Sequence, residues 1–355
     1  MIDLIRPCFI PSAVQGTFTY ASTIDPAIND LYAKYAYMPN SKNLPIVLLM
    51  HGYDSDASSF TNETMEAFAR KNIFACAVGL RGFNDAGGAS DSSAREIYDI
   101  YDALSYIRTN FPDIVSSNRA AVVGYSSGGG NALACTCKFP DTWTDIVSHF
   151  GISDYGHDAT YGWYQEVAEY RTTMETRIGG NPTAVPNAYY ARAHVLALAN
   201  YSGGHIQFFH DVDDAQVPVD QTQRAVAALV AAGLINYTAR YTSSANVIRW
   251  LHAYPTARDP VHWTSDIWSL PITKQTHAVW TIPASGSVKV MGYIVTKRFS
   301  IWLGDGTAHA ADVVYNTATD SYTVTPLTGE AAVTITQGAK TVTQTISEVT
   351  TLTVV

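Results

Sequence analysis

One short stretch, residues 122–130, constrains the fold of this chain more than any other. It reads Val-Val-Gly-Tyr-Ser-Ser-Gly-Gly-Gly, a strand-like apolar run that meets the pattern G-x-S-x-G and continues into small, helix-compatible residues. This pattern is typical of a sharp strand-to-helix turn that exposes a serine hydroxyl. Gly124 and Gly128 fit such a turn because the backbone approaches so closely there that a Cβ atom would clash. Ser126 is therefore the candidate nucleophile, since its hydroxyl can be acylated once a base takes its proton.

The first three quarters of the chain alternate between apolar runs and amphipathic segments. Residues 1–44 are expected to form strands and turns that lead into the main sheet. The later expected strands are 45–50, 73–78, 119–123, 145–150, 204–210 and 236–242, and the expected helices are 62–71, 96–109 and 220–234. Continuous apolar runs of strand length indicate strands that are covered on both faces. Alternation of this kind predicts an α/β fold with a mostly parallel sheet flanked by helices.

From about residue 278 the pattern changes to short runs rich in Val, Thr, Ile and Tyr, separated by Gly, Asp and Asn. The expected strands are 287–295, 299–303, 312–315, 321–325, 332–336 and 341–346. This pattern predicts a small all-β, sandwich-like module. We therefore expect a catalytic domain over residues 1–277 and a C-terminal β-domain over residues 278–355.

Composition narrows the classes of partner. The 355 residues carry a net charge of −9, which argues against nucleic acid or an anionic membrane as the main partner. No apolar run approaches the length of about 20 residues that a transmembrane helix needs. Only 15% of the residues are charged, which favours a secreted or particle-associated protein, although no signal-peptide pattern is visible at the N-terminus.

The sequence offers no recognisable cofactor or metal site. Four cysteines in a chain of this length do not form a disulfide framework. Cys135 and Cys137 stand two residues apart, a spacing that suits neither zinc nor a thioredoxin-type pair. No HExxH motif, P-loop or dinucleotide-binding glycine pattern occurs in its required context. We therefore expect neither a cofactor nor a metal.

A second motif allows a family resemblance to be stated. Asp214, Val217 and Pro218 form the pattern D-x-x-V-P after an apolar run. This loop resembles the acid loop of the prolyl-oligopeptidase-like and dienelactone-hydrolase-like α/β hydrolases. The resemblance extends over roughly residues 40–235, and its other motifs are His51-Gly52, Arg81-Gly82, Ile152-Ser153-Asp154-Tyr155, Gly179-Gly180-Asn181-Pro182 and Tyr189-Tyr190. It implies an α/β-hydrolase sheet and a Ser-Asp-His triad in that chain order.

The resemblance assigns the acid and base of the triad. Asp214 is implied as the acid, with Asp211 and Asp213 as alternatives. His262 is implied as the base, because it lies in a loop just before an expected short helix and has an aromatic neighbour. His252 lies inside a strand pattern, where a packed histidine is expected, and His277 lies near the domain junction. Both remain alternatives.

The oxyanion hole needs two backbone N–H donors. Ser127 follows the nucleophile and supplies one. By the resemblance, Tyr53 supplies the other. His51 and the Arg81-Gly82 pair are expected to support this loop rather than to react with substrate.

Residues 152–203 are longer than a simple crossover and rich in aromatic residues, and they resemble a cap over the active site. The family's peptidases carry a large N-terminal β-propeller, for which residues 1–44 are too short. We therefore expect a serine esterase that acts on a small or polymeric ester, such as an acylated polysaccharide or a polyester. A peptidase or amidase with the same triad is the first alternative, and a non-catalytic binding protein is the second. The aromatic residues of the β-module are expected to form its core. If they were exposed, they could contact carbohydrate, polymer or a partner chain.

Overall fold

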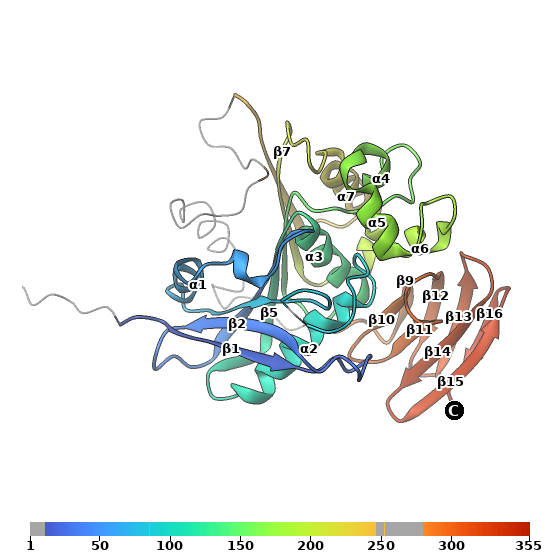
Figure 1. Ribbon diagram of the computed structural model, residues 1–355. Coiled ribbons are helices and arrows are strands. Elements are labelled where there is room, and N and C mark those ends of the chain that lie inside the picture. Colours follow the sequence, from blue (N-terminus) through green and yellow to red (C-terminus); the bar gives the residue numbers. More distant parts are fainter. Residues whose placement is uncertain (1–10, 85, 246–251, 253–279) are drawn as a thin grey trace, which may run out of the picture.

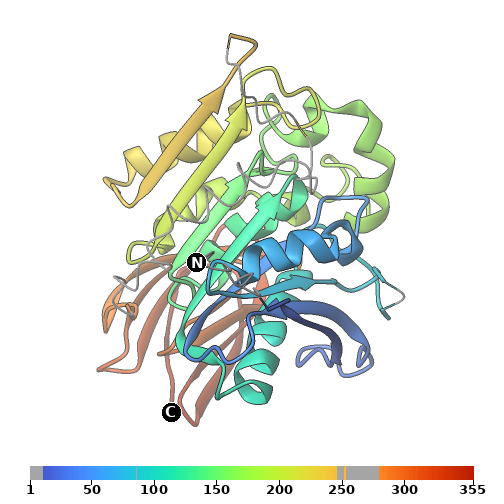
Figure 2. The same cartoon turned by 90° about the vertical axis from the view of Figure 1, so that its left-hand side faces the viewer.

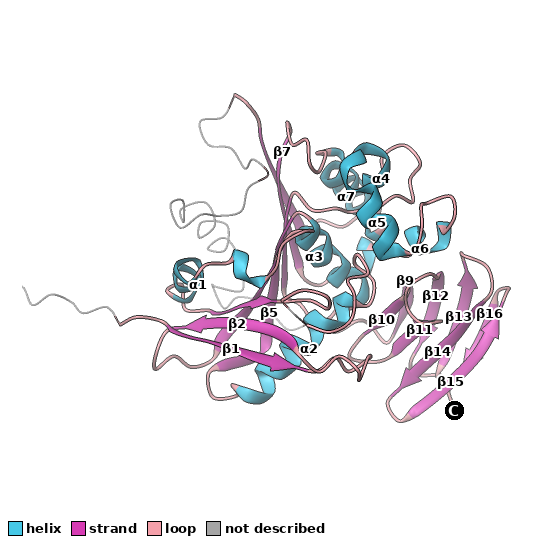
Figure 3. Ribbon diagram, viewed as in Figure 1, coloured by secondary structure: helices cyan, strands magenta, loops and turns pink. Residues whose placement is uncertain are grey.

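We describe the chain from a computed structural model, in which residues 11–84, 86–245, 252 and 280–355 are described. A sheet with helices on both faces forms the larger part, and strands alone form the C-terminal part (Figure 1, Figure 3). The prediction of a mostly parallel sheet followed by an all-β unit is therefore confirmed. The expected boundary between residues 277 and 278 lies outside the described residues.

The larger sheet has eight strands in the order β1-β2-β4-β3-β5-β6-β7-β8. Their bounds are Val14–Tyr20, Leu31–Tyr37, Leu44–Met50, Phe74–Val78, Val115–Tyr125, Asp145–His149, His205–Asp211 and Tyr237–Thr242 for β1 to β8. Strands β1, β2 and β4 pair antiparallel, and all pairs from β4·β3 to β7·β8 are parallel. The carboxyl ends of β3, β5, β6 and β7 therefore meet at one edge, where a parallel sheet places its ligands.

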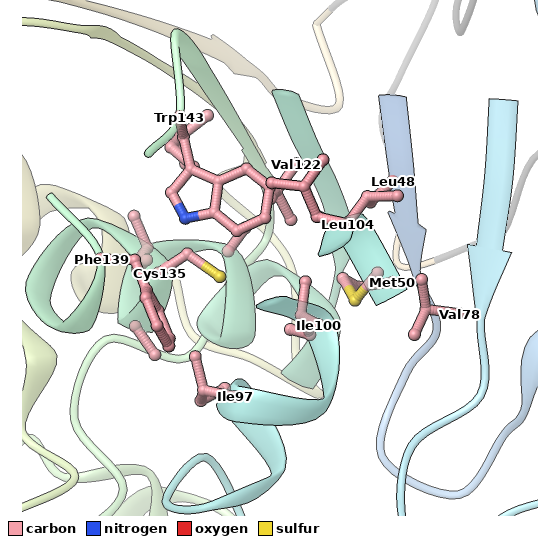
Figure 4. Packing of buried hydrophobic residues seen from close by; sticks show 14 of the residues in the cluster. Leu48, Met50, Val78, Ile97, Ile100, Leu104, Val122, Cys135, Phe139 and Trp143 are labelled. Atoms are coloured by element: carbon pink, nitrogen blue, oxygen red, sulfur yellow. The ribbon is translucent and has the colours of Figure 1, made fainter. Parts of the chain in front are cut away.

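Helices cover the two faces of this sheet unequally. Helix α1 (Asn62–Ala69) packs on one face through Met65 and Phe68. On the other face lie α2 (Glu96–Asn110), α3 (Ser127–Lys138) and α7 (Asp220–Ala231). Figure 4 shows the interior of that face, where Ile97, Ile100 and Leu104 of α2 meet the side chains of the central strands. Cys135 of α3 is buried in the same cluster, and this packing fixes the helix that follows Ser126.

The segment between β6 and β7 forms short helices rather than one long helix. They are α4 (Trp163–Glu166), α5 (Arg171–Ile178) and α6 (Pro186–Tyr190). The same segment contains the 3-10 turns Ala168–Tyr170, His194–Leu196 and Leu198–Asn200. The sequence pattern over residues 165–177 predicts a single helix instead. The chain breaks it at Val167, whose extended backbone ends α4. The three helices lie together beside the carboxyl edge of the sheet (Figure 1).

The C-terminal unit has eight strands in two four-stranded halves, β15-β14-β11-β10 and β9-β12-β13-β16. The strands β9 to β16 span Ser285–Met291, Tyr293–Val295, Ser300–Leu303, Ala310–Asn316, Ser321–Pro326, Ala331–Gln337, Lys340–Ile346 and Thr350–Thr353. A single pair, Met291 with Tyr293, joins the halves. The expected strand over residues 287–295 is thus broken at Gly292, where φ is +77° and a Cβ atom would lie 2.1 Å from the Gly306 carbonyl oxygen. The unit is sandwich-like, as predicted.

Aromatic side chains in this unit are mostly core residues. Phe299, Tyr315 and Tyr322 are buried together with the aliphatic residues of both halves. Tyr293 is buried on the other side, in the cluster that includes the catalytic-domain helices, and its ring stacks on Trp302 at 4.4 Å. The expectation that these rings form a core is confirmed for these buried residues.

Buried polar contacts fasten the C-terminal unit to the larger part, and the C-terminal strands gather on one side of the molecule (Figure 2). The Asn200 side chain donates to the Lys289 carbonyl at 2.8 Å and accepts from its N–H at 3.0 Å. The Asp141 carboxylate accepts from the Ile282 N–H at 3.1 Å. Lys138, at the end of α3, donates its Nζ to the Met291 carbonyl and lies 4.4 Å from the Tyr293 ring centroid. The same helix therefore begins directly after Ser126 and ends against the C-terminal unit.

Lys138 makes the stability of this contact depend on pH. Burial lowers the pKa of its ammonium group to about 7, below the usual value near 10.5. Between these values the unfolded chain binds a proton that the folded chain has lost, so folding becomes more favourable as the pH rises through that window. Between pH 7 and pH 9, we expect the free energy of unfolding of the wild type to rise by about 2 kcal/mol more than that of Lys138→Met, which lacks the titrating group. Denaturant titrations at both pH values measure this, and parallel profiles for the two proteins would contradict it.

Within the described ranges no helix is long and apolar enough to cross a membrane. Those ranges also contain no group of three or more His, Cys, Asp or Glu side chains that could hold a metal ion. Cys76, Cys135 and Cys137 are buried and free.

Candidate active site

The turn predicted around Ser126 is present and strained. Ser126 joins β5 to α3 with φ of +58° and ψ of −123°, in a region that side chains other than glycine rarely adopt. A Cβ atom on Gly124 would lie 1.9 Å from the Gly128 carbonyl oxygen, and one on Gly128 would lie 2.4 Å from the Met50 carbonyl oxygen. Both glycines are thus required by close backbone contact, as the sequence predicted. The turn presents Ser126 at the carboxyl edge of the sheet.

The carboxylate that faces the site comes from Asp214, in the loop after β7. Its Oδ1 accepts from the N–H groups of Gln216 at 2.9 Å and Val217 at 3.0 Å, and its side chain is fully buried. These two hydrogen bonds fix the orientation of the carboxylate. The neighbouring carboxylates bind elsewhere. Asp211 accepts from the Thr242 hydroxyl at 2.8 Å, and Asp213 accepts from the Ser244 N–H at 3.1 Å.

A histidine lies between Asp214 and Ser126, and it is His252. Its Nδ1 lies 2.8 Å from Asp214 Oδ2, and its Nε2 lies 3.1 Å from Ser126 Oγ. The Phe150 ring packs against the imidazole, with 4.5 Å between ring centroids. The family resemblance implies His262 for this position. His262 and the second alternative, His277, lie outside the described residues, so among the described histidines the geometry brings His252 to the nucleophile.

The strand-like pattern around His252 is the reason why the sequence favours His262 over it. Asn246-Val-Ile-Arg-Trp-Leu precedes it, and such an apolar run suggested an inserted hairpin with a packed histidine. A signal in favour of His252 was nonetheless present. It follows Asp214 by 38 residues and is nearer to the acid than His262, and the family resemblance implies a base soon after the acid.

The two residues expected to form the oxyanion hole lie next to the nucleophile. Ser127 is the first residue of α3, where a backbone N–H has no carbonyl partner within the helix and the helix dipole favours negative charge. Tyr53 follows β3 and is buried, and its hydroxyl forms a hydrogen bond with the Ser92 hydroxyl at 2.8 Å. Its phenol therefore points away into a polar contact, which leaves the backbone as the part that can serve the site.

A pocket of about 240 Å³ opens at Ser126 and His252. Its walls combine apolar rings with polar groups and backbone. The lining residues are Gly52, Tyr53, Asp54, Ser55, Ser126, Phe150, Tyr170, Gln216 and His252.

The cap-like segment contributes to this pocket mainly by supporting it. Tyr155, Trp163 and Tyr189 are buried together in one cluster with Tyr53. The Trp163 indole donates to the Gln216 carbonyl at 2.8 Å and so holds the acid loop. Tyr170 is the cap residue that lines the pocket itself.

Nearby residues that could be mistaken for catalytic groups have structural contacts. Burial lowers the pKa of His51 to about 4, so its ring is neutral at pH 7, and its Nδ1 lies 2.9 Å from the Gly52 carbonyl oxygen. Arg81 forms a buried bidentate pair with Asp99, with Nε–Oδ2 at 2.9 Å and Nη2–Oδ1 at 2.6 Å. Both residues therefore support the loops around the site, as expected from the sequence.

The chain matches one family model and a number of solved structures. The sequence model of the prolyl oligopeptidase family matches residues 59–269. A search of curated proteins finds none that matches the sequence.

Solved structures share the fold. Acylaminoacyl peptidase from Pyrococcus horikoshii is 17% identical with a TM-score of 0.58, covering 72% of this chain and 40% of its own. A puromycin-hydrolysing peptidase from Mycobacterium tuberculosis is 19% identical with a TM-score of 0.57, covering 74% and 40%. Esterase Pf2001 from Pyrococcus furiosus is 16% identical with a TM-score of 0.51, covering 75% and 92%. This chain thus spans well under half the length of the two peptidases and nearly all of the esterase.

Proposed function

The chain belongs to the prolyl oligopeptidase family of serine hydrolases, and from this premise we propose that it hydrolyses carboxylic esters through an acyl-enzyme intermediate on Ser126. The observation that carries the proposal is the continuous contact from Ser126 Oγ through His252 to Asp214, at 3.1 Å and 2.8 Å. A hydroxyl, a base and an orienting carboxylate within hydrogen-bond reach form the arrangement that activates a serine nucleophile.

Acylation begins at the Ser126 hydroxyl. His252 Nε2 takes its proton as Oγ attacks the ester carbonyl, and the carbonyl electron pair moves onto oxygen. The N–H groups of Tyr53 and Ser127 hold this oxyanion. When the tetrahedral intermediate collapses, the ester C–O bond breaks and the alcohol leaves with the proton that His252 returns.

Deacylation repeats these steps with water. His252 Nε2 takes a proton from a water molecule that attacks the acyl carbon, and the same two N–H groups hold the oxyanion. When this second intermediate collapses, the bond between the acyl carbon and Ser126 Oγ breaks, His252 returns the proton to Oγ, and the carboxylic acid is released. Throughout, the Asp214 carboxylate accepts the Nδ1–H of His252, which fixes the tautomer and stabilises the imidazolium that forms in both steps.

Two observations support an ester over an amide. The chain matches nearly the whole of an esterase, whereas it matches 40% of each of the two peptidases described above. The pocket is also small and partly aromatic, which fits an acyl group better than an extended peptide.

A peptidase or amidase is the second candidate, because peptidases are among the structures that share the fold. The same triad could cleave an amide with the additional demand that His252 protonate a poorer leaving group.

The two candidates are separated by a substrate panel. We expect p-nitrophenyl acetate and butyrate to be turned over, with activity falling for octanoate because the pocket is small. Aminoacyl p-nitroanilides are expected to react at least about 100-fold more slowly in kcat/KM, since amides carry a higher intrinsic barrier. Faster cleavage of the anilides than of the esters would favour the peptidase, and inertness toward both, without labelling by a fluorophosphonate probe, would sink the hydrolase proposal.

A further inference from the structure

Arg177, near the end of cap helix α5, contacts the loop that follows β3 at three points. Its Nη1 donates to the Tyr53 carbonyl at 2.9 Å. Its guanidinium lies 4.1 Å from the centroid of the Tyr53 ring. Its Nη2 lies 3.3 Å from Asp54 Oδ1. The planar guanidinium can make such contacts at once because its donors are fixed in one plane and its face stacks on aromatic rings.

These contacts complete the immobilisation of Tyr53. The phenol is tied to Ser92 at 2.8 Å, so the residue is held at its hydroxyl, across its ring and at its carbonyl. With the carbonyl and the side chain both fixed, the rotation of the adjoining peptide that carries the Tyr53 N–H is restricted as well. An oxyanion donor has to be held to within about 0.5 Å of its productive position.

We infer that Arg177 is a positioning residue that aims the Tyr53 N–H at the oxyanion, and that the cap therefore completes the oxyanion hole. This inference rests on the proposed function, in which Tyr53 is one of the two donors. Arg177 acts through Tyr53: it is not among the residues that line the pocket, and Asp54 already pairs with its charge.

The alternative role for Arg177 is to stabilise the cap alone, and a second arginine on the same helix provides the matched control. Arg171 donates its Nε to the Tyr164 carbonyl at 2.7 Å and its Nη2 to the Gln165 carbonyl at 2.8 Å. It thus fastens the cap to itself, without a contact to the loop after β3 among those that the structure describes. Arg171→Met and Arg177→Met remove the same group from the same helix.

The experiment measures kcat and KM for p-nitrophenyl butyrate, and the inhibition constant of a trifluoromethyl ketone, for the wild type, Arg177→Met, Arg177→Lys and Arg171→Met. The ketone forms a tetrahedral adduct with the serine and so reports oxyanion binding. Circular dichroism and the thermal midpoint show whether each variant is folded.

For Arg177→Met we expect kcat to fall about 30-fold with KM within about twofold, and the inhibition constant to rise in parallel, because a misplaced donor loses part of the 10²- to 10³-fold contribution of an oxyanion contact. Arg177→Lys should recover part of the loss, and Arg171→Met should leave kcat within about twofold.

Equal losses of kcat in folded Arg171→Met and Arg177→Met, or a change confined to KM, would overturn the inference and leave Arg177 as a cap residue. If Arg177→Met does not fold, Arg177→Lys becomes the test variant. An unchanged kcat and an unchanged inhibition constant for Arg177→Lys would then overturn the inference. Failure of the proposed function would look different, because the wild type itself would not hydrolyse the ester.

Discussion

Replacing His252 with alanine is expected to lower kcat/KM for p-nitrophenyl butyrate by about 10⁴-fold or more, whereas His262→Ala should stay within about threefold of the wild type. His252 is the histidine that contacts both Ser126 Oγ and Asp214 Oδ2. Without it, no other side chain in the described part of the chain is within hydrogen-bond reach of Ser126 Oγ to take its proton or to protonate the leaving alcohol.

The measurement is steady-state kinetics on both variants, with His277→Ala as a further control. Each variant is first shown to be folded by its thermal midpoint. The result that would contradict the assignment is the reverse order, in which His262→Ala is inactive and His252→Ala retains most of the activity. Such a result would mean that a residue outside the described part of the chain supplies the base.

Ser126→Ala is expected to show the second large effect, a loss of about 10⁴- to 10⁶-fold in kcat, and no labelling by a fluorophosphonate probe. The adjacent residue provides the control. Ser127 is assigned a role through its backbone N–H, which alanine retains, so Ser127→Ala should keep kcat within about tenfold of the wild type.

This pair also separates two explanations of any lost activity. Both serines are buried in the same turn, so damage to the turn would affect both variants alike. Labelled, active Ser126→Ala protein would show that another residue is the nucleophile.

Much of the sheet could be predicted from the sequence because the local signals agree. The apolar runs before His51 and before Ser126 became the adjacent parallel strands β3 and β5. The nucleophile turn was also predictable, since the required glycines lie within a few residues of Ser126.

The break at Gly292 was missed, because the residues on either side continue the strand pattern. At Gly292 the backbone has a φ of +77°, and a Cβ atom would lie 2.1 Å from the carbonyl oxygen of Gly306, a residue outside the local strand pattern. No propensity within a short window reports a contact of this kind.

Two contacts in the candidate site could not be predicted from the sequence, those of His252 and of Arg177. His252 and Ser126 lie 126 residues apart, and Arg177 and Tyr53 lie 124 apart. Their meeting depends on how loops from separate elements fold over the carboxyl edge of the sheet, which is a tertiary property. Patterns in the sequence nominate both His252 and His262, but no local pattern reports the contact between His252 and Ser126.

The most direct test of ester hydrolysis through Ser126 is to trap the acyl-enzyme. Wild-type protein mixed with p-nitrophenyl butyrate and quenched in acid within milliseconds is digested and analysed by mass spectrometry. We predict a butyryl group on the peptide that contains Ser126, appearing with the first burst of nitrophenol and absent from Ser126→Ala. Turnover with the butyryl group on another residue, or undiminished turnover by Ser126→Ala, would contradict the mechanism.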